Sequence, residues 1–191
     1  MPWNAPSEVV TSQSLMGLAE ACLTADGATV AGSRVYQPGD WPTQRSQMPV
    51  IKLRILRERR QSQGRSGAPQ FTTVTVLRVV GEVEAYAAED NAGATAAEAA
   101  CWALKRQIEV AIVNSHDLFM RIQQIASIDS QLVISAEGAT HIAAVVMDFA
   151  LEFFEDADSF HPIEADDVAE VDLSATRYSP DAPVTATIPL T

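Results

Sequence analysis

The sequence predicts an α+β protein, in which a mostly antiparallel β-sheet carries two helices packed on one face. Two observations lead to this fold class. Long segments near the middle of the chain alternate strictly between apolar and polar residues, and two stretches with helical periodicity stand before and after them. We expect one domain over residues 1–163, followed by an acidic, proline-containing C-terminal arm or flexible tail over residues 164–191.

The first element is a helix from Ser7 to Thr24. Apolar residues recur at helical spacing and form a stripe wide enough to dock on a sheet: Leu15, Leu18, Ala19 and Cys22. Ser7 is a suitable N-cap. The turn pair Asp26–Gly27 ends the helix.

A short strand, Arg34 to Tyr36, and a loop from Gln37 to Gln47 come next. The loop contains two prolines and a glycine, and it carries Trp41. This side chain either packs onto the core or is displayed for a partner. We favour packing because an exposed tryptophan without a partner is unusual, although displayed tryptophans are enriched at interfaces.

The centre of the fold is a pair of alternating segments, Pro49 to Glu58 and Gln70 to Tyr86. In the first, Lys52 and Arg54 lie opposite the apolar face; in the second, Arg78 does. The stretch between them, RRQSQGRSGAP, is too long for a tight turn and includes Arg65. We therefore predict a long strand–arm–strand hairpin with a basic arm.

A second helix begins at Ala94 or Thr95, where Glu98 is in position to complete a capping box, and it ends near Asn114. One face of this helix is apolar: Ala97, Cys101, Leu104, Ile108 and Ala111. A short turn or helix at 118–121 and a strand that ends at Ser135 follow. The segment 139–155 fits a helix or a strand, and its alternation favours a strand.

Charge is segregated along the chain, whose net charge is −12. Residues 34–78 contain nine Lys or Arg against two acids, whereas residues 137–191 contain twelve acids against one Arg. A basic surface on one copy can meet an acidic surface on another. Alternatively, the two regions neutralise each other within one monomer or stay solvated.

The sequence contains no nucleotide-binding, zinc-protease or serine-hydrolase motif, so we expect no enzymatic activity. We expect no cofactor and no metal, because the cysteines and histidines are not at ligand spacing and the acids after Glu152 lack the spacing of a calcium loop. Cys22 and Cys101 are interpreted as buried free thiols. No apolar run reaches the length of a membrane span and no signal peptide is evident. The basic arm lacks the interleaved aromatics of a nucleic-acid site, so we expect no specific nucleic-acid binding.

The pattern as a whole resembles the tail terminator family of long-tailed bacteriophages, also called tail completion or minor tail protein U-like proteins. The resemblance spans Val9 to Ile163 and rests on element order and three segments: RVY, PVIKLRILRERRQSQGRSGAPQFTTVTVLRVVGEVEA and SAEGATHIAAVVMDFALEFFE. The acidic segment after Ile163 departs from the family pattern.

The resemblance implies a virion structural protein that assembles into a homo-hexameric ring, caps the tail tube and ends its polymerisation. The implied partners are the tail tube protein and a head-completion or connector protein, with DNA passing through the ring lumen. The implied location is the head-proximal end of the tail in the virion, and the host cytoplasm during assembly.

We hypothesise that contacts between ring subunits join a basic group to an acidic group and include Trp41. The basic group is Arg54, Arg57, Arg59, Arg60 and Arg65. The acidic group is Asp148, Glu152, Glu155 and Asp156. Two alternatives remain: another ring of the head–tail junction, such as a head-closure adaptor or tube subunit, and a small binding module whose basic arm takes an anionic ligand.

Overall fold

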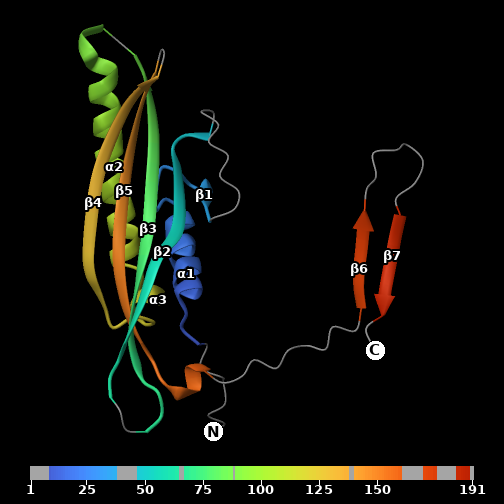
Figure 1. The fold of residues 1–191 in the computed structure, drawn as a ribbon. Coiled ribbons are helices and arrows are strands. Elements are labelled where there is room, and N and C mark those ends of the chain that lie inside the picture. The colour runs from blue at the N-terminus through green and yellow to red at the C-terminus, as the bar shows by residue number, and fades with distance from the viewer. Residues whose placement is uncertain are drawn as a thin grey trace. The chain divides into compact units, whose positions relative to one another are not determined.

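The computed structural model describes residues 9–37, 47–64, 67–87, 89–137, 140–160, 170–175 and 184–189. The chain divides into two compact units, Met1–Ser159 and Phe160–Thr191. The first unit contains a five-stranded mixed sheet and three helices (Figure 1). The α+β class expected from the sequence is therefore confirmed.

The sheet has the strand order β1-β2-β3-β5-β4. Its strands are β1 (Val35–Tyr36), β2 (Val50–Ser62), β3 (Phe71–Tyr86), β4 (Gln124–Glu137) and β5 (Thr140–Glu155). β1 runs parallel to β2, and every other neighbouring pair is antiparallel. The segment that fitted a helix or a strand is β5, an interior strand of the sheet, as its alternation favoured.

The helices are α1 (Ser12–Thr24), α2 (Ala92–Val113) and the short α3 (His116–Phe119). They lie behind the sheet in Figure 1, with α2 against β3 and β5 and α1 against β2. Their apolar faces and one face of the sheet form a single core, whose largest members include Phe149, Phe153, Leu77 and Leu104. The opposite face of the sheet carries no helix among the described residues.

Two predicted helix starts were wrong. Thr11 caps α1, because its side chain accepts a hydrogen bond from the Ser14 amide while the Thr11 amide donates one to the Ser14 hydroxyl. Helix α2 begins at Ala92, directly after a 3-10 turn at Glu89–Asn91, so Thr95 and Glu98 lie inside it. A capping box cannot form there because the first-turn amides lie further towards the N-terminus.

The predicted arm between β2 and β3 is shorter than expected. β2 continues to Ser62 and pairs with β3 as far as Phe71, so Arg59 and Arg60 belong to the ladder. Polar residues fill both faces of this end, which removes the period-2 signal that marks a half-buried strand. The connection covers residues 63–70, of which 65 and 66 lie outside the described residues.

The second unit contains an antiparallel pair, β6 (Glu170–Ala175) and β7 (Val184–Pro189). The sequence analysis did not predict these strands, because the segment has few large apolar residues and many acids.

No helix in the described part of the chain is long and apolar enough to cross a membrane. Both cysteines are free thiols: Cys101 is buried in the core and Cys22 is half-buried. Burial raises the pKa of each thiol to about 11.

Candidate assembly interface

The face of the sheet that lies opposite the helices, called here the open face, carries a row of four charged residues. Arg54 in β2 is directly opposite Arg78 in β3, which is opposite Asp148 in β5, which is opposite Asp129 in β4. Directly opposed residues share a face of the sheet. The row therefore runs from two cations at the β2 side to two anions at the β4 side.

Arg78 and Asp148 join the middle of this row. The guanidinium donates to both carboxylate oxygens, with Nε–Oδ1 and Nη2–Oδ2 distances of 2.7 Å each. This bidentate arrangement fixes orientation as well as charge. The hydrogen bonds from Arg78 hold the pKa of Asp148 below its usual value of 3.8, and the same bonds raise the pKa of Arg78.

The rest of the open face continues this separation of charge. On β2, Arg57 and Arg59 are exposed and lie opposite Val76 and Val74, which places them on this face. Lys52 is buried and pairs with Glu82 at 2.8 Å. On the same open face but towards β4, the half-buried Glu152 of β5 adds a third acidic residue to Asp129 and Asp148.

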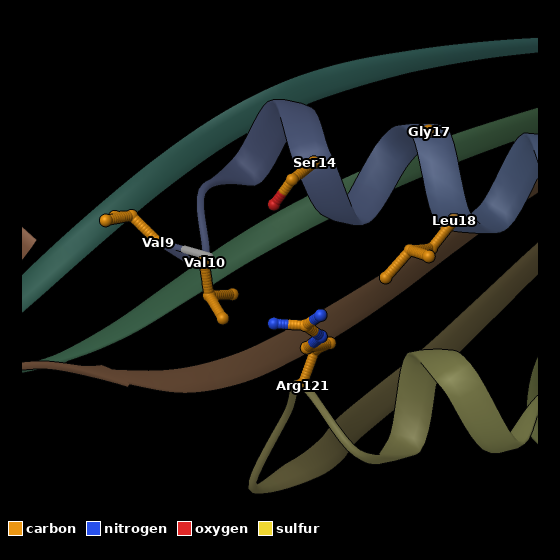
Figure 2. Close-up of a pocket in the computed structure, with 6 residues that line it drawn as sticks. All are labelled: Val9, Val10, Ser14, Gly17, Leu18 and Arg121. Carbon is orange, nitrogen blue, oxygen red and sulfur yellow. The ribbon is translucent and has the colours of Figure 1, made fainter. Parts of the chain in front are cut away.

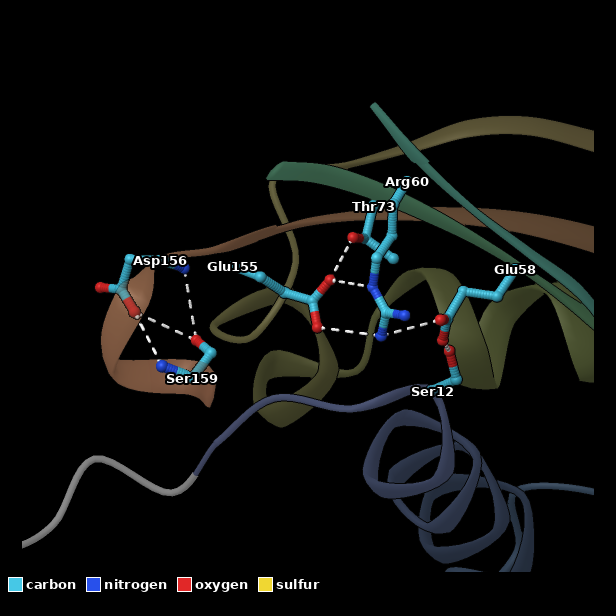
Figure 3. Close-up of polar contacts among 7 residues, drawn as sticks. All are labelled: Ser12, Glu58, Arg60, Thr73, Glu155, Asp156 and Ser159. Atoms are coloured by element: carbon cyan, nitrogen blue, oxygen red, sulfur yellow. Dashed lines mark hydrogen bonds and ion pairs between the residues drawn. The ribbon is translucent and has the colours of Figure 1, made fainter. Parts of the chain in front are cut away.

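A second charged cluster lies on the helix-bearing face, at the end of the sheet near the start of α1 (Figure 3). Glu155, only 4% exposed, accepts hydrogen bonds from Arg60 Nε at 2.7 Å, from Arg60 Nη2 at 3.3 Å and from the Thr73 hydroxyl. Arg60 Nη2 also lies 2.9 Å from Glu58 Oε1, and Glu58 accepts from the Ser12 hydroxyl. The hydrogen bond to Glu155 raises the pKa of Arg60.

The structure brings several of the predicted interface residues together within one chain. Arg60 pairs with Glu155, and Asp148 pairs with Arg78. Asp156 accepts from the Ser159 amide at 3.2 Å and from its hydroxyl at 3.1 Å, which caps the 3-10 turn at Ala157–Phe160 (Figure 3). For these residues, neutralisation within the monomer accounts for part of the charge segregation.

The remaining interface predictions have different outcomes. Arg54, Arg57, Arg59 and Glu152 all lie on the open face, as the side-chain alternation requires. Trp41 and Arg65 lie outside the described residues. The proposed subunit contacts stay predictions.

Sequence reasoning predicted a strand that ends at Ser135 but missed the full length of β4 and the position of Asp129. β4 is exposed along most of both faces, so its sequence has no clean alternation. The register irregularity between Ile125 and Ser127 further shifts the pattern by one residue. The available signal was the absence of Lys, Arg and Pro from Gln124 to Glu137.

The described surface also has cavities. One, of about 190 Å³, lies between the start of α1 and the segment after α3, and Figure 2 shows the Arg121 guanidinium pointing into the space beside Val10 and Leu18. Another, of about 300 Å³, is mainly apolar and includes Tyr86, Met48 and Val30 in its lining. No group of three or more metal-ligating side chains occurs in the parts of the chain that the structure describes.

Comparison with known proteins gives no assignment: no family model matches the chain, and no curated protein matches it.

Proposed function

We propose that this protein is a virion structural protein, a tail terminator that assembles as a ring. The ring, expected to be a hexamer, caps the tail tube, ends its polymerisation and offers a surface to the head-completion protein. The observation that carries this proposal is a sheet with two open edges of opposite charge. A head-to-tail interface between unlike edges generates a ring when the rotation closes.

The first open edge is β4. It is 14 residues long, and in the described part of the chain no strand pairs with its outer side. Ile128, Val133 and Ile134 are between 39% and 47% exposed. Proteins usually protect such an edge with lysine, proline or a covering segment. An edge without these residues is expected where a partner strand covers it.

The second open edge is β2 beyond its contact with β1. β1 pairs with β2 only at Ile51 and Lys52. From Leu53 to Ser62, no described strand lies on the outer side of β2. Arg54, Arg57 and Arg59 project from this edge strand on the open face, which gives it the opposite charge from β4 and β5.

The function proposed here is carried by surfaces, without catalysis, a cofactor or a membrane. The partners are further copies of the chain, the tail tube protein and the head-completion protein. DNA passes through the ring lumen without specific recognition. The protein acts in the host cytoplasm during assembly and at the head-proximal end of the tail in the virion.

Two measurements test the proposal: the mass of the protein in solution and its effect on the length of tail tubes. Light scattering behind a sizing column at low and moderate salt should give a single species near six protomers. Added to polymerising tail tubes, the protein should bind their ends and stop elongation, seen as shorter tubes by electron microscopy. A monomer that neither assembles nor binds tubes contradicts the proposal.

Two alternatives give different results in the same experiment. A tube subunit would build long tubes by itself, and a head-closure adaptor would bind the connector without stopping tube growth. The exposed Arg57 and Arg59 also suit a monomeric module that binds an anionic ligand. That alternative predicts a monomer under all conditions.

A further inference from the structure

At each end of the charged row on the open face, two residues of like charge lie directly opposite each other. Arg54 lies directly opposite Arg78, and Asp129 lies directly opposite Asp148. Like charges opposed across two strands destabilise a sheet. Arg78 and Asp148 satisfy each other, so Arg54 and Asp129 are left at the two outer positions.

Arg54 has a further deficit. Its Nε atom is buried, and no described residue accepts a hydrogen bond from it. A buried donor without an acceptor destabilises the structure, and more strongly when the group is charged. Asp129 is exposed, and it accepts a hydrogen bond from the nearby Ser127 hydroxyl at 3.5 Å.

We propose that β4 of one copy pairs antiparallel with β2 of the next copy, and that Asp129 accepts a hydrogen bond from Arg54 across this junction. The proposal rests on the self-assembly proposed above and names the contact that drives it. The row then continues from copy to copy, so that each end cation meets an end anion.

Strand direction fits this junction. β2, β3, β5 and β4 are antiparallel in succession, so β2 and β4 run in opposite directions. A rotation about an axis nearly parallel to the strands brings the next copy's β2 antiparallel to β4. In antiparallel ladders, directly opposed pairs alternate along a row between hydrogen-bonded and non-hydrogen-bonded. Because the row crosses four strands, the backbone N–H and C=O groups of Arg54 and Asp129 either both point away from the sheet or both point into it. The two residues can therefore form a regular antiparallel pair.

The levels below the row fit as well. The register places Ile128 level with Ile55, and Gln124 level with Arg59. The irregularities of the two edge strands lie one level apart, at Leu56 between Ile55 and Arg57 in β2 and at Ala126 between Ile125 and Ser127 in β4. Ile128, 39% exposed in the single chain, would then pack against Ile55 on the helix-bearing face. The junction begins just beyond the part of β2 that β1 occupies.

The test reverses each charge separately and then recombines the variants. Arg54→Asp and Asp129→Arg should each raise the concentration needed for assembly by at least about tenfold, because both copies at the junction then carry the same sign. A 1:1 mixture of the two variants should recover assembly, since alternating copies restore an opposite pair at every junction. The double variant should assemble alone.

A control with the same charge change as Asp129→Arg lies away from the row. Asp26→Arg alters the turn after α1. This variant should assemble like the wild type. Circular dichroism and thermal unfolding show whether each variant folds, and recovery in the mixture cannot occur with unfolded chains.

The outcomes separate this contact from the proposed function. Recovery of assembly in the mixture supports the contact. If the wild type forms rings and both single variants form them equally well, or if folded variants are not rescued by mixing, the contact is wrong and the ring remains. If the wild type stays monomeric alone and with tubes, both proposals are overturned.

Discussion

At the scale of single residues, the pair formed by Arg78 and Asp148 ties β3 to β5 on the open face. Its hydrogen bonds lower the pKa of Asp148, so the carboxylate stabilises the fold above its ordinary pKa, and this contribution is lost as the pH falls through the lowered value. Asp148→Asn should reduce the free energy of unfolding at pH 7 by about 1–3 kcal/mol.

The measurement is urea unfolding of both proteins at pH 7 and near pH 3. The difference between them should shrink at the lower pH, because pH 3 lies below the ordinary pKa of 3.8 and the unfolded wild-type chain then binds the proton. A difference of the same size at both pH values would show that the charge of Asp148 is not what matters.

Neighbouring arginines on β2 have separate roles, because adjacent side chains point to opposite faces. Arg60→Ala removes the cation that pairs with the buried carboxylate of Glu155 and should destabilise the monomer by about 1–3 kcal/mol. Arg59→Ala removes an exposed side chain of the open face and should change stability by less than about 0.5 kcal/mol.

Thermal unfolding and assembly of both variants check this prediction. Arg60→Ala should mainly lower the melting temperature, and Arg59→Ala should mainly weaken assembly. The reverse pattern would place Arg60 at a subunit contact, as the sequence alone suggested.

At the scale of elements, Gly81 sets how closely α2 approaches β3. A Cβ at this position would lie 2.9 Å from Leu104 Cδ2 and 3.2 Å from both Ile108 Cδ1 and Val145 Cγ1. A glycine inside a strand often marks such a close approach. Gly81→Val should therefore destabilise the first unit by about 1–3 kcal/mol through overpacking.

Gly17 of α1 is the matched control, because a Cβ there meets nothing within 4 Å. Gly17→Ala should leave stability unchanged or raise it by up to about 1 kcal/mol, since alanine favours helix. Denaturant unfolding compares the two variants. Equal effects would mean that helix and strand do not meet as closely at Gly81 as the structure shows.

The elements that could be predicted are those with one buried face. The alternation in β3 and β5 and the apolar stripe on α2 follow from contact with the core. The buried faces that carry Leu77, Phe149 and Leu104 could therefore be predicted from the sequence. The end of β2 and most of β4 lack that contact. They are held by backbone ladders that impose no side-chain pattern, and for this reason their bounds and the importance of Asp129 could not be predicted.

At the scale of the whole molecule, the charge segregation of the sequence was informative but ambiguous. It predicted that basic and acidic surfaces meet, without showing whether they meet within one chain or between copies. The structure assigns Arg60–Glu155 and Arg78–Asp148 to the single chain. Arg54 and Asp129 remain as the ends of one row, and their pairing depends on the cross-strand register, which a sequence does not display.

The division into two units predicts that the first unit folds and assembles without the second. Among the residues that the structure describes, the hydrophobic core lies between Leu15 and Phe153, and the row from Arg54 to Asp129 also lies in the first unit. A chain ending at Phe160 should therefore fold, melt within a few degrees of the full protein and assemble at a similar concentration.

Calorimetry and light scattering on the shortened chain measure both properties. In the shortened chain, Arg54→Asp should still weaken assembly, and Asp129→Arg should still rescue it in a mixture. A shortened chain that folds but stays monomeric, while the full chain forms rings, would place an essential subunit contact in residues 161–191. The junction between β4 and β2 would then be insufficient to hold the ring together.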